Sequence, residues 1–253
     1  MESLAVAQRY LDALISHDAE SVPLATGARR TNNGCLAVEG VEAMRAVIRR
    51  EPVAAMHDLR WLVSGEHAVV FYDLEADLGR GEGPVTARPE DWMPASIGER
   101  FRVRGGMIEE IEVVYATAAP GTPRPERPAL YPAGEADREV VLAASRAYVA
   151  ALLSHDATSV PLADKAWRVE NGRDTGRSGP AIRASLESDV MSSIESITEE
   201  SWFATEDSAA AFYTLTVNRE GASVSLRVAE RFRAVDGQLV EVEAVVGPPI
   251  KSA

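Results

Sequence analysis

The sequence predicts an α+β protein built from two tandem copies of one domain, each with three N-terminal helices packed on a curved antiparallel sheet. Three observations support this prediction. The same short strings occur twice in the same order, and within each copy the apolar period changes from helical to alternating. A stretch rich in proline, alanine and glycine separates the two copies.

The repeat begins with the string QRYLDALISHD at 8–18, which returns as RAYVAALLSHD at 146–156. At the same offset Arg30 matches Arg168, and an Asn-Gly pair follows each of them. Near the end of each copy, ERFRVRGGMIEEIEVV matches ERFRAVDGQLVEVEAV. Because the order of the strings is the same in both halves, the chain contains an internal duplication.

The two copies are predicted to be separate domains at 1–117 and 139–253. Between them, 118–138 contains several prolines together with alanine and glycine. Proline cannot continue a helix or a central strand, so this stretch is predicted to be an extended linker.

Within each copy, helices are predicted first and strands afterwards. Val6, Tyr10, Ala13 and Leu14 have helical spacing in the opening segment. The SHDAESVPLA string ends this helix and starts a short second one, and an extended segment ending in Asn-Gly follows. A third helix is predicted at GVEAMRAVIRRE and at GPAIRASLESDV. The period then becomes two, which predicts a hairpin and two further long strands in each copy.

Composition excludes several classes of function. The formal net charge is −13, so a nucleic-acid phosphate backbone would be repelled and nucleic acid is not an expected partner. The one cysteine, Cys35, rules out an intramolecular disulfide. The start resembles a first helix and not a signal peptide, and no apolar run is long enough for a membrane span. The expected location is the cytoplasm, without a membrane partner.

Both copies place an acid on an apolar strand face. In LRVAERFRA at 226–234, apolar residues occupy one face and arginines the other, yet Glu230 falls on the apolar side. Glu99 does the same in the first copy. A buried carboxylate is costly unless it is paired or protonated, and burial raises its pKa. The alternative is a structural acid that pairs with an inward arginine or caps a neighbouring helix.

The chain resembles the NTF2-like superfamily, in particular its SnoaL-like and ketosteroid-isomerase-like members. QRYLDALISHD resembles the first helix of ketosteroid isomerase, and RSGPAIRASL at 177–186 resembles the entry into that family's third helix. ERFRAVDGQLVEVEAVV resembles the last strand pair. The resemblance covers nearly all of the chain outside the linker and implies two cone-shaped domains. It indicates fold better than function, because this fold supports isomerases, cyclases, dehydratases, epoxide hydrolases and binding modules.

The resemblance also implies roles for particular residues. The tyrosine that donates a hydrogen bond to the substrate oxygen corresponds to Tyr148, and to Tyr10 in the first copy. The carboxylic acid beside it corresponds to Glu230 and Glu99. Ketosteroid isomerase combines such an oxyanion hole with a carboxylate base. From the residues themselves, Tyr148 lies on an apolar helix face, and a protonated Glu230 is the expected partner of its buried hydroxyl.

The general base of that family corresponds to Glu170 in the second copy. In the first copy the position is Asn32, which cannot act as a base. In WRVENG, Arg168 and Glu170 share the strand face opposite Trp167 and Val169. Either face could line a pocket, and a surface pair between Arg168 and Glu170 is the alternative.

Other residues receive weaker assignments. Trp61 and Trp202 are expected in the core, at positions that line the cavity of such a cone-shaped fold. His17 and His155 are expected to cap helix C-termini. No group of His, Asp and Glu has metal-ligand spacing, so neither a metal nor another cofactor is expected. The epoxide hydrolases of the superfamily use an Asp-Arg-Asp set, and the arginines flanking Glu230 are expected on the opposite face, which argues against that chemistry.

The sequence therefore predicts a cofactor-independent enzyme that moves a proton on a small apolar carbonyl compound, as an isomerase or cyclase does. Glu170 is the predicted base, and Tyr148 with Glu230 is predicted to hold the enolate. Tyr10, Asn32, Glu99, Trp61 and Trp202 are predicted ligand-binding residues. The two copies are expected to pair as an intrachain pseudo-dimer, with further association into a homo-oligomer as an option. The alternative is a non-catalytic module for small-molecule binding or assembly.

Overall fold

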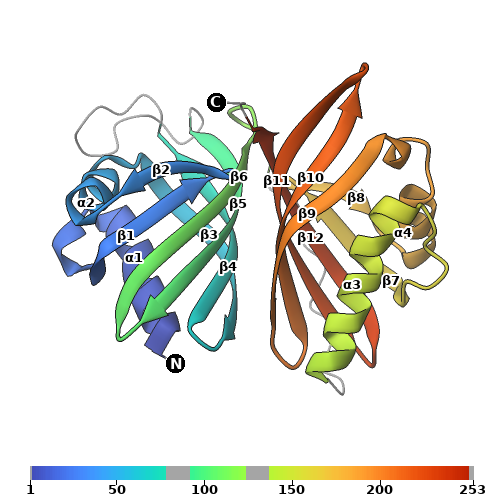
Figure 1. Cartoon of the computed structure of the whole chain (residues 1–253), viewed down its shortest axis with the longest axis horizontal. Helices are drawn as coiled ribbons and strands as arrows, with labels where there is room; N and C mark the ends of the chain where they lie inside the picture. The colour runs from blue at the N-terminus through green and yellow to red at the C-terminus, as the bar shows by residue number, and fades with distance from the viewer. Residues whose placement is uncertain (1, 78–91, 124–136, 251–253) are drawn as a thin grey trace. The chain divides into compact units, whose positions relative to one another are not determined.

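The computed structural model describes residues 2–77, 92–123 and 137–250 (Figure 1). The chain divides into two compact units, Met1–Arg124 and Pro125–Ala253. The predicted linker at 118–138 spans this division, and 124–136 lies outside the described residues. The first copy is longer than the second at 81–100, and 81–91 of this stretch also lies outside the described residues.

The first unit contains helices before and between its first strands and then a four-strand meander (Figure 1). Its elements are α1 (Glu2–Ser16), a 3-10 turn η1 (Ala19–Ser21), β1 (Leu24–Asn32), β2 (Cys35–Glu39), α2 (Val41–Arg50), β3 (Val53–Ser64), β4 (His67–Ala76), β5 (Met93–Arg104) and β6 (Met107–Thr117).

The second unit repeats this order (Figure 1). Its elements are α3 (Arg138–Ser154), β7 (Leu162–Glu170), β8 (Arg173–Gly176), α4 (Gly179–Leu186), a 3-10 turn η3 (Met191–Ser193), β9 (Ile194–Ala204), β10 (Ser208–Arg219), β11 (Ala222–Val235) and β12 (Gln238–Pro249).

Each unit has one six-stranded sheet, with strand order β2-β1-β6-β5-β4-β3 in the first and β8-β7-β12-β11-β10-β9 in the second. The prediction of a purely antiparallel sheet is wrong, because β1 pairs with β6 and β7 pairs with β12 in parallel. Hairpin turns force only consecutive strands to run antiparallel. In each of these two pairs the partners are the first and last strands of the unit, so no hairpin fixes their relative direction. The α+β class agrees with the prediction.

The prediction of three helices per unit is also wrong. Among the described residues, each unit has two α-helices. The expected second helix is only the 3-10 turn η1 in the first unit, and a non-helical turn at 158–159 in the second. Few residues separate the first helix from Pro23 or Pro161, and such a short segment cannot offset the cost of helix nucleation.

Short sequence motifs fix the entry into the fourth helix. Ser178 caps α4 by accepting a hydrogen bond from the backbone N–H of Ala181 at 3.2 Å. A Cβ atom added to Gly179 would lie 2.4 Å from the carbonyl oxygen of Ala163. The Arg-Ser-Gly motif thus combines a helix cap with a close approach of α4 to β7.

The Asn-Gly pairs form the tight turns between β1 and β2 and between β7 and β8. Asn171 and Gly172 have φ angles of 48° and 70°, the left-handed pair that such hairpins require. The Asn171 side chain also accepts a hydrogen bond from the backbone of Val246 at 2.8 Å, which ties the turn to β12. Asn33 makes the matching bond to Tyr115 in the first unit.

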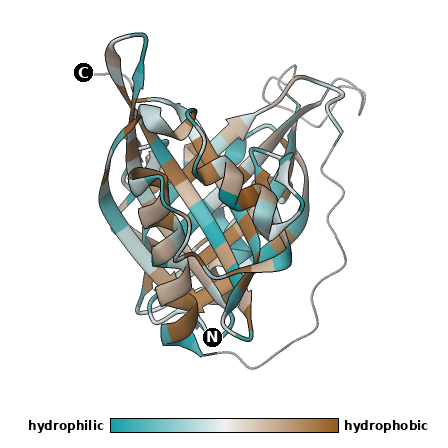
Figure 2. Cartoon of the chain, turned by 90° about the vertical axis from the view of Figure 1, so that its right-hand side faces the viewer, coloured by the Kyte–Doolittle hydropathy of each residue, from teal (hydrophilic) through white to brown (hydrophobic). Residues whose placement is uncertain are grey.

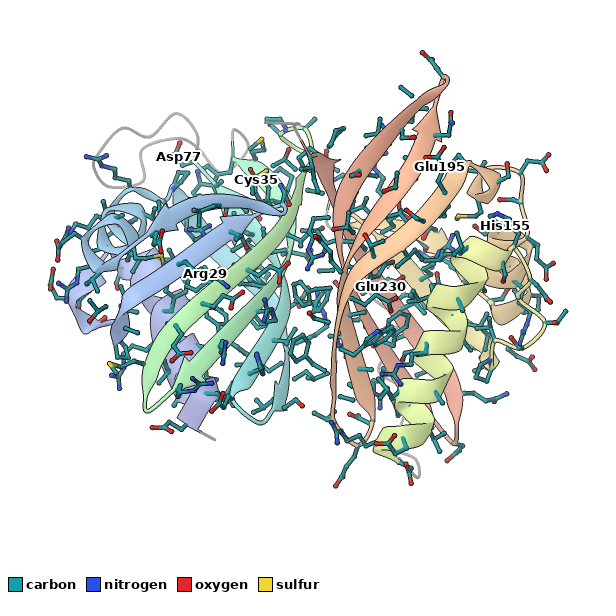
Figure 3. All side chains as sticks on the ribbon, in the orientation of Figure 1. Arg29, Cys35, Asp77, His155, Glu195 and Glu230 are labelled. Atoms are coloured by element: carbon teal, nitrogen blue, oxygen red, sulfur yellow. The ribbon has the colours of Figure 1, made fainter. Side chains whose placement is uncertain are left out.

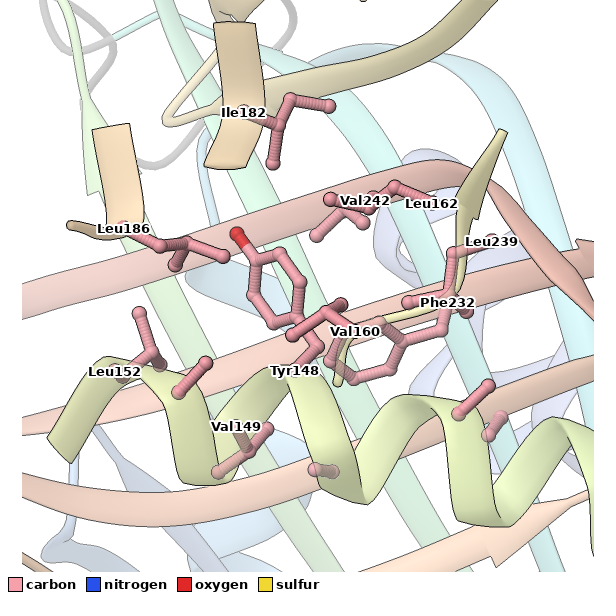
Figure 4. Packing of buried hydrophobic residues seen from close by; sticks show 14 of the residues in the cluster. Tyr148, Val149, Leu152, Val160, Leu162, Ile182, Leu186, Phe232, Leu239 and Val242 are labelled. Atoms are coloured by element: carbon pink, nitrogen blue, oxygen red, sulfur yellow. The ribbon is translucent and has the colours of Figure 1, made fainter. Parts of the chain in front are cut away.

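The first helix of each unit packs across four strands of its sheet. In the second unit the mostly apolar α3 lies on the strands (Figure 2). The Tyr148 ring meets Phe232 edge-on, with 5.4 Å between ring centroids (Figure 4). Tyr10 and Phe101 make the same contact at the same separation in the first unit. The core of each unit is thus formed between its two helices and the apolar sheet face, as the strand pattern predicts. No helix of the described part of the chain is long and apolar enough to cross a membrane.

Replacement of Gly179 by alanine is expected to destabilise the protein by about 1–3 kcal/mol, because the new methyl group meets backbone that cannot rotate away. Gly27→Ala is the control, since a Cβ atom at Gly27 has no neighbour within 4 Å. Urea unfolding of the full chain measures both variants. Equal midpoints for Gly179→Ala and the wild type would contradict the proposed close approach.

Candidate active site

The second unit encloses a cavity of about 230 Å³ between α3 and the sheet. Most of its wall is apolar. Seven polar side chains from five elements also line it: Tyr148 of α3, Arg168 and Glu170 of β7, Ser193 of η3, Tyr213 and Arg219 of β10, and Glu230 of β11. The three predicted catalytic residues, Tyr148, Glu170 and Glu230, therefore lie on one cavity.

Strand alternation places Arg168 and Glu170 on the cavity side of β7. Ala166, Arg168 and Glu170 share one face of the strand, and both polar residues line the cavity. Arg168 is only 5% exposed. The alternative of a surface pair between Arg168 and Glu170 is therefore wrong.

Glu230 is buried at 3% exposure, on the apolar face where the strand pattern places it (Figure 3). Ala211 is its cross-strand neighbour, so Tyr213, two residues along β10, faces the same side. The Tyr213 hydroxyl donates a hydrogen bond to Oε2 of Glu230 at 2.9 Å. Burial raises the pKa of Glu230 to about 8, and the negative charge of Glu170 adds to this; Tyr213 and Arg168 oppose it. The acid is therefore mostly protonated at neutral pH.

Tyr148 has a different hydrogen-bond partner from the one the sequence suggests. Its hydroxyl points away from α3 (Figure 4) and accepts a hydrogen bond from Nη1 of Arg168 at 3.4 Å. Among the described residues the structure pairs Glu230 with Tyr213 and not with Tyr148. Burial and the nearby Glu230 nevertheless raise the pKa of Tyr148, so the phenol keeps its proton at neutral pH.

Arg168 is held by neutral groups. Its Nε donates to Oγ1 of Thr175 at 2.9 Å, and its Nη2 donates to the Thr175 carbonyl at 3.2 Å and to Oγ of Ser185 at 2.8 Å. Within the residues that the structure describes, Arg168 has no carboxylate partner at ion-pair distance. These bonds fix the guanidinium beside Tyr148.

The first unit has a larger cavity of about 360 Å³. Arg30 and Asn32 line it at the positions of Arg168 and Glu170, together with Glu51. Arg30 donates to Tyr10 at 3.4 Å, to Oδ1 of Asn32 at 3.0 Å and to Oε1 of Glu51 at 2.7 Å. The first unit therefore keeps the arginine and its phenol but provides its carboxylate from another element.

Glu99 repeats the environment of Glu230. It is 1% exposed, and its Oε2 accepts a hydrogen bond from the Tyr72 hydroxyl at 2.9 Å. Burial raises the pKa of Glu99 to about 7, although Arg30 and Tyr72 oppose the shift. The same unusual acid is thus present in both units.

Trp61 and Trp202 pack against the cores and do not belong to the described lining of either cavity. The Trp202 ring stacks on Phe232 with 6.3 Å between centroids, and the Arg146 guanidinium lies 5.6 Å from the Trp202 ring centroid. Their predicted ligand-binding role has no support in this arrangement, because neither tryptophan lines a described cavity.

His155 ends α3 in the left-handed conformation (Figure 3), and its backbone N–H donates to the carbonyl of Ala151 at 3.0 Å. His17 has a similar positive φ angle after α1. The prediction that these histidines occupy helix ends is confirmed. Among the described residues, no group of three or more His, Cys, Asp and Glu side chains is arranged to hold a metal ion.

Comparison with protein families gives a match to a domain of unknown function, DUF8021, over residues 1–115 and 134–246. The chain belongs to the DUF8021 family. The match covers both units, in agreement with the duplication. A comparison with curated protein sequences found no match.

Solved structures similar to this DUF8021 chain each cover about one unit. A protein from Kribbella flavida DSM 17836, provisionally described as a ketosteroid isomerase, is 18% identical, with a TM-score of 0.37, and the alignment covers 52% of this chain and 91% of that one. An epoxide hydrolase of the LEH-like type from M. tuberculosis is 16% identical, with a TM-score of 0.38 and coverage of 43% and 84%. An NTF2-like protein from Burkholderia xenovorans LB400 is 13% identical, with a TM-score of 0.36 and coverage of 46% and 89%.

Sequence reasoning missed three kinds of residue around the two sites of this DUF8021 chain. Tyr72 and Tyr213 recur in the matched strings VVFYDL and AAFYTL, and that repetition was the available signal. The inward orientation of Arg30 and Arg168 was one of two open possibilities. Glu51 matches the acid Asp189 at the same offset, but only Glu51 lines a cavity.

Replacement of Glu230 by glutamine is expected to change stability in a pH-dependent way. Between the ordinary glutamate pKa of about 4.3 and the folded value of about 8, the unfolded chain releases a proton that the folded chain keeps. The wild type therefore loses stability as pH rises through this window, and glutamine does not titrate. The free energy of unfolding of Glu230→Gln, relative to that of the wild type, should therefore rise by on the order of a few kcal/mol from about pH 5 to about pH 8.

Urea unfolding at a series of pH values measures this difference. Glu206 is exposed, so Glu206→Gln should differ from the wild type by a constant amount. A difference between Glu230→Gln and the wild type that also stays constant with pH would show that Glu230 is ionised in the folded protein.

Proposed function

We propose that the second unit catalyses proton transfer at a carbon next to the carbonyl group of a small apolar compound, without a cofactor. The observation that carries this proposal is the convergence of Glu170, Tyr148 and Glu230 on one largely apolar cavity. A carboxylate base and two neutral hydrogen-bond donors are the groups that enolate formation requires.

In the proposed reaction the Glu170 carboxylate takes a proton from the carbon next to the carbonyl group. The electrons of that C–H bond form the C=C bond of an enolate, and negative charge develops on the carbonyl oxygen. Tyr148 and protonated Glu230 donate hydrogen bonds to this oxygen. Return of the proton from Glu170 to a different carbon completes an isomerisation. Exchange results when the proton on Glu170 is first replaced by one from solvent, which Glu170 then returns to the same carbon.

The hydrogen-bond directions support this assignment of donors. The Tyr148 oxygen accepts from Arg168, so its own proton is available to the cavity. Oε2 of Glu230 accepts from Tyr213, so the acid proton of Glu230 is also available. Two donor chains, Arg168 to Tyr148 and Tyr213 to Glu230, thus lead to the same cavity. Because these hydrogen bonds are already formed before a substrate binds, the donors need not reorient as charge develops on the carbonyl oxygen.

The alternative function is ligand binding without turnover. One observation favours it: both units keep the phenol and the buried acid, whereas the carboxylate in the Glu170 position is absent from the first unit. An apolar ketone that binds tightly but gains no exchange above the buffer rate would support this alternative.

Replacement of Glu170 by glutamine is expected to lower the rate of α-proton exchange by at least about 10-fold, since a positioned base contributes about 10²–10⁴-fold to such reactions. The probe is β-tetralone, a small apolar ketone, in deuterium oxide. Proton NMR follows the loss of its α-proton signals with the full chain as catalyst. Asp164 lies exposed on the same strand, so Asp164→Asn is the matched control and should exchange at the wild-type rate.

Two outcomes would contradict the proposal. One is wild-type exchange no faster than buffer, and the other is an unchanged rate in Glu170→Gln. Tyr148→Phe tests the donor separately: it should lower the exchange rate by about 10-fold or more while β-tetralone still binds, because the lost donor acts mainly on the developing enolate.

A further inference from the structure

The second cavity carries a cation that the proposed reaction does not use. Arg219 lines the cavity from the last position of β10, and it is exposed to solvent. It makes no hydrogen bond or ion pair with another described residue. Arg168, in contrast, is buried and held by Thr175 and Ser185. Of the two arginines in the described lining, Arg219 is therefore the one available to a ligand.

The register of β10 and β11 arranges the cavity lining in order along the strands. The buried acid Glu230 and its hydrogen-bond partner Tyr213 lie at one end. Leu215 and Val217 follow on the same face of β10, and Arg219 comes last, directly before the hairpin turn. An antiparallel strand rises about 3.4 Å per residue, so the Cα atoms of Tyr213 and Arg219 lie up to about 20 Å apart. An apolar stretch thus separates the proposed reaction centre from the cation.

The acids around the cavity lie away from Arg219. Glu170 and Glu230 both pair with Ala244 of β12, one on either side, so the two cavity acids share the row far from the hairpin turn. Glu195 of β9 lies near the hairpin (Figure 3), but its carboxylate accepts hydrogen bonds from two hairpin side chains at 2.6 and 3.0 Å. At the hairpin end, the described lining of the cavity contains no acid.

An exposed apolar side chain also belongs to the lining. Val190 is 76% exposed, and it directly precedes η3, which contacts β10. Transfer of such a side chain from water to an apolar ligand is favourable. The solvent-exposed part of the cavity thus combines an apolar contact with an unpaired positive charge, and both features suit an amphipathic anion.

The repeat shows that the cation accompanies the proposed base. Arg219 matches Leu78 of the first copy, and Glu170 matches Asn32. The first copy therefore has neither the carboxylate nor the cation at these positions, although it keeps the phenol and the buried acid. The joint presence of Arg219 and Glu170 in one copy supports their use on the same ligand.

We propose that Arg219 determines specificity by binding a carboxylate of the substrate, so that the substrate class is an apolar keto acid with its carbonyl group and its carboxylate at opposite ends. This inference rests on the proposed proton transfer at Glu170. The carbonyl group lies beside Tyr148 and Glu230, and the apolar chain passes the aliphatic side chains of β10. Arg219 donates charge-assisted hydrogen bonds to the carboxylate, far from the negative charge of Glu170.

Two compounds of the same shape test the role of the charge. 9-Oxodecanoate is a methyl ketone with a carboxylate at the far end of an apolar chain, and 9-oxodecanamide is its uncharged match. Proton NMR in deuterium oxide follows their Glu170-dependent α-proton exchange. Arg219→Gln should raise KM for the acid about 3- to 10-fold and leave kcat nearly unchanged, because an exposed pair remote from the reacting carbon contributes to binding alone. KM for the amide should not change.

Arg138→Gln is the matched control and should change neither KM, because Arg138 is an exposed arginine of the same unit that does not line the described cavity. Calorimetric titration of the full chain measures binding without turnover. The wild type should bind the acid more tightly than the amide, and this preference should shrink in Arg219→Gln and at high salt, since salt screens exposed pairs. Circular dichroism and urea unfolding check that each variant is folded.

The two proposals fail in different ways. If the acid has the same KM and Kd in Arg219→Gln as in the wild type, or binds no better than the amide, the inference about Arg219 is overturned and the proton transfer is not. If neither compound shows Glu170-dependent exchange, the proposed function is contradicted. Arg219-dependent binding of the acid would then still support the carboxylate site.

Discussion

The burial of a carboxylic acid within an apolar sheet face is the constraint on which the rest of each unit depends. Glu230 and Glu99 lie on strand faces that otherwise pack the core, and this burial favours the neutral acid over its charged form. In each unit a tyrosine of the neighbouring strand donates to the acid at 2.9 Å, and a buried arginine lies near enough to oppose the shift of its pKa. In the second unit this acid, both phenols and the arginine line one cavity.

The buried arginine explains why the two copies diverged in a coordinated way. A guanidinium that is almost fully covered needs several acceptors, and either neutral groups or a carboxylate can provide them. Thr175 and Ser185 provide them for Arg168, which leaves Glu170 without a hydrogen bond to that arginine among the described residues. Arg30 instead binds Asn32 and Glu51. Each solution provides one cavity carboxylate, from a strand in one unit and from a helix end in the other.

The sequence predicts those features that depend on local periodicity. The duplication, the order of helices and strands, and the burial of Glu99 and Glu230 follow from repeated strings and from alternation along single strands. The contact of Tyr213 with Glu230 depends on the register between two strands, and that of Arg168 with Tyr148 depends on how α3 crosses the sheet. The parallel pairing of β1 with β6 and the position of Glu51 likewise depend on packing between distant segments, which no single string encodes.

Direct titration of the buried acids tests the central claim that burial keeps them protonated far above the ordinary glutamate range. Carbon NMR of the full chain with labelled glutamate carboxyl groups follows each protonation, and Glu230→Gln and Glu99→Gln assign the two signals. The account predicts one carboxyl group that titrates near pH 8 and one near pH 7, each absent from its own variant. Titration of all glutamates in the ordinary acidic range would contradict it, because charged acids could not donate to a substrate oxygen.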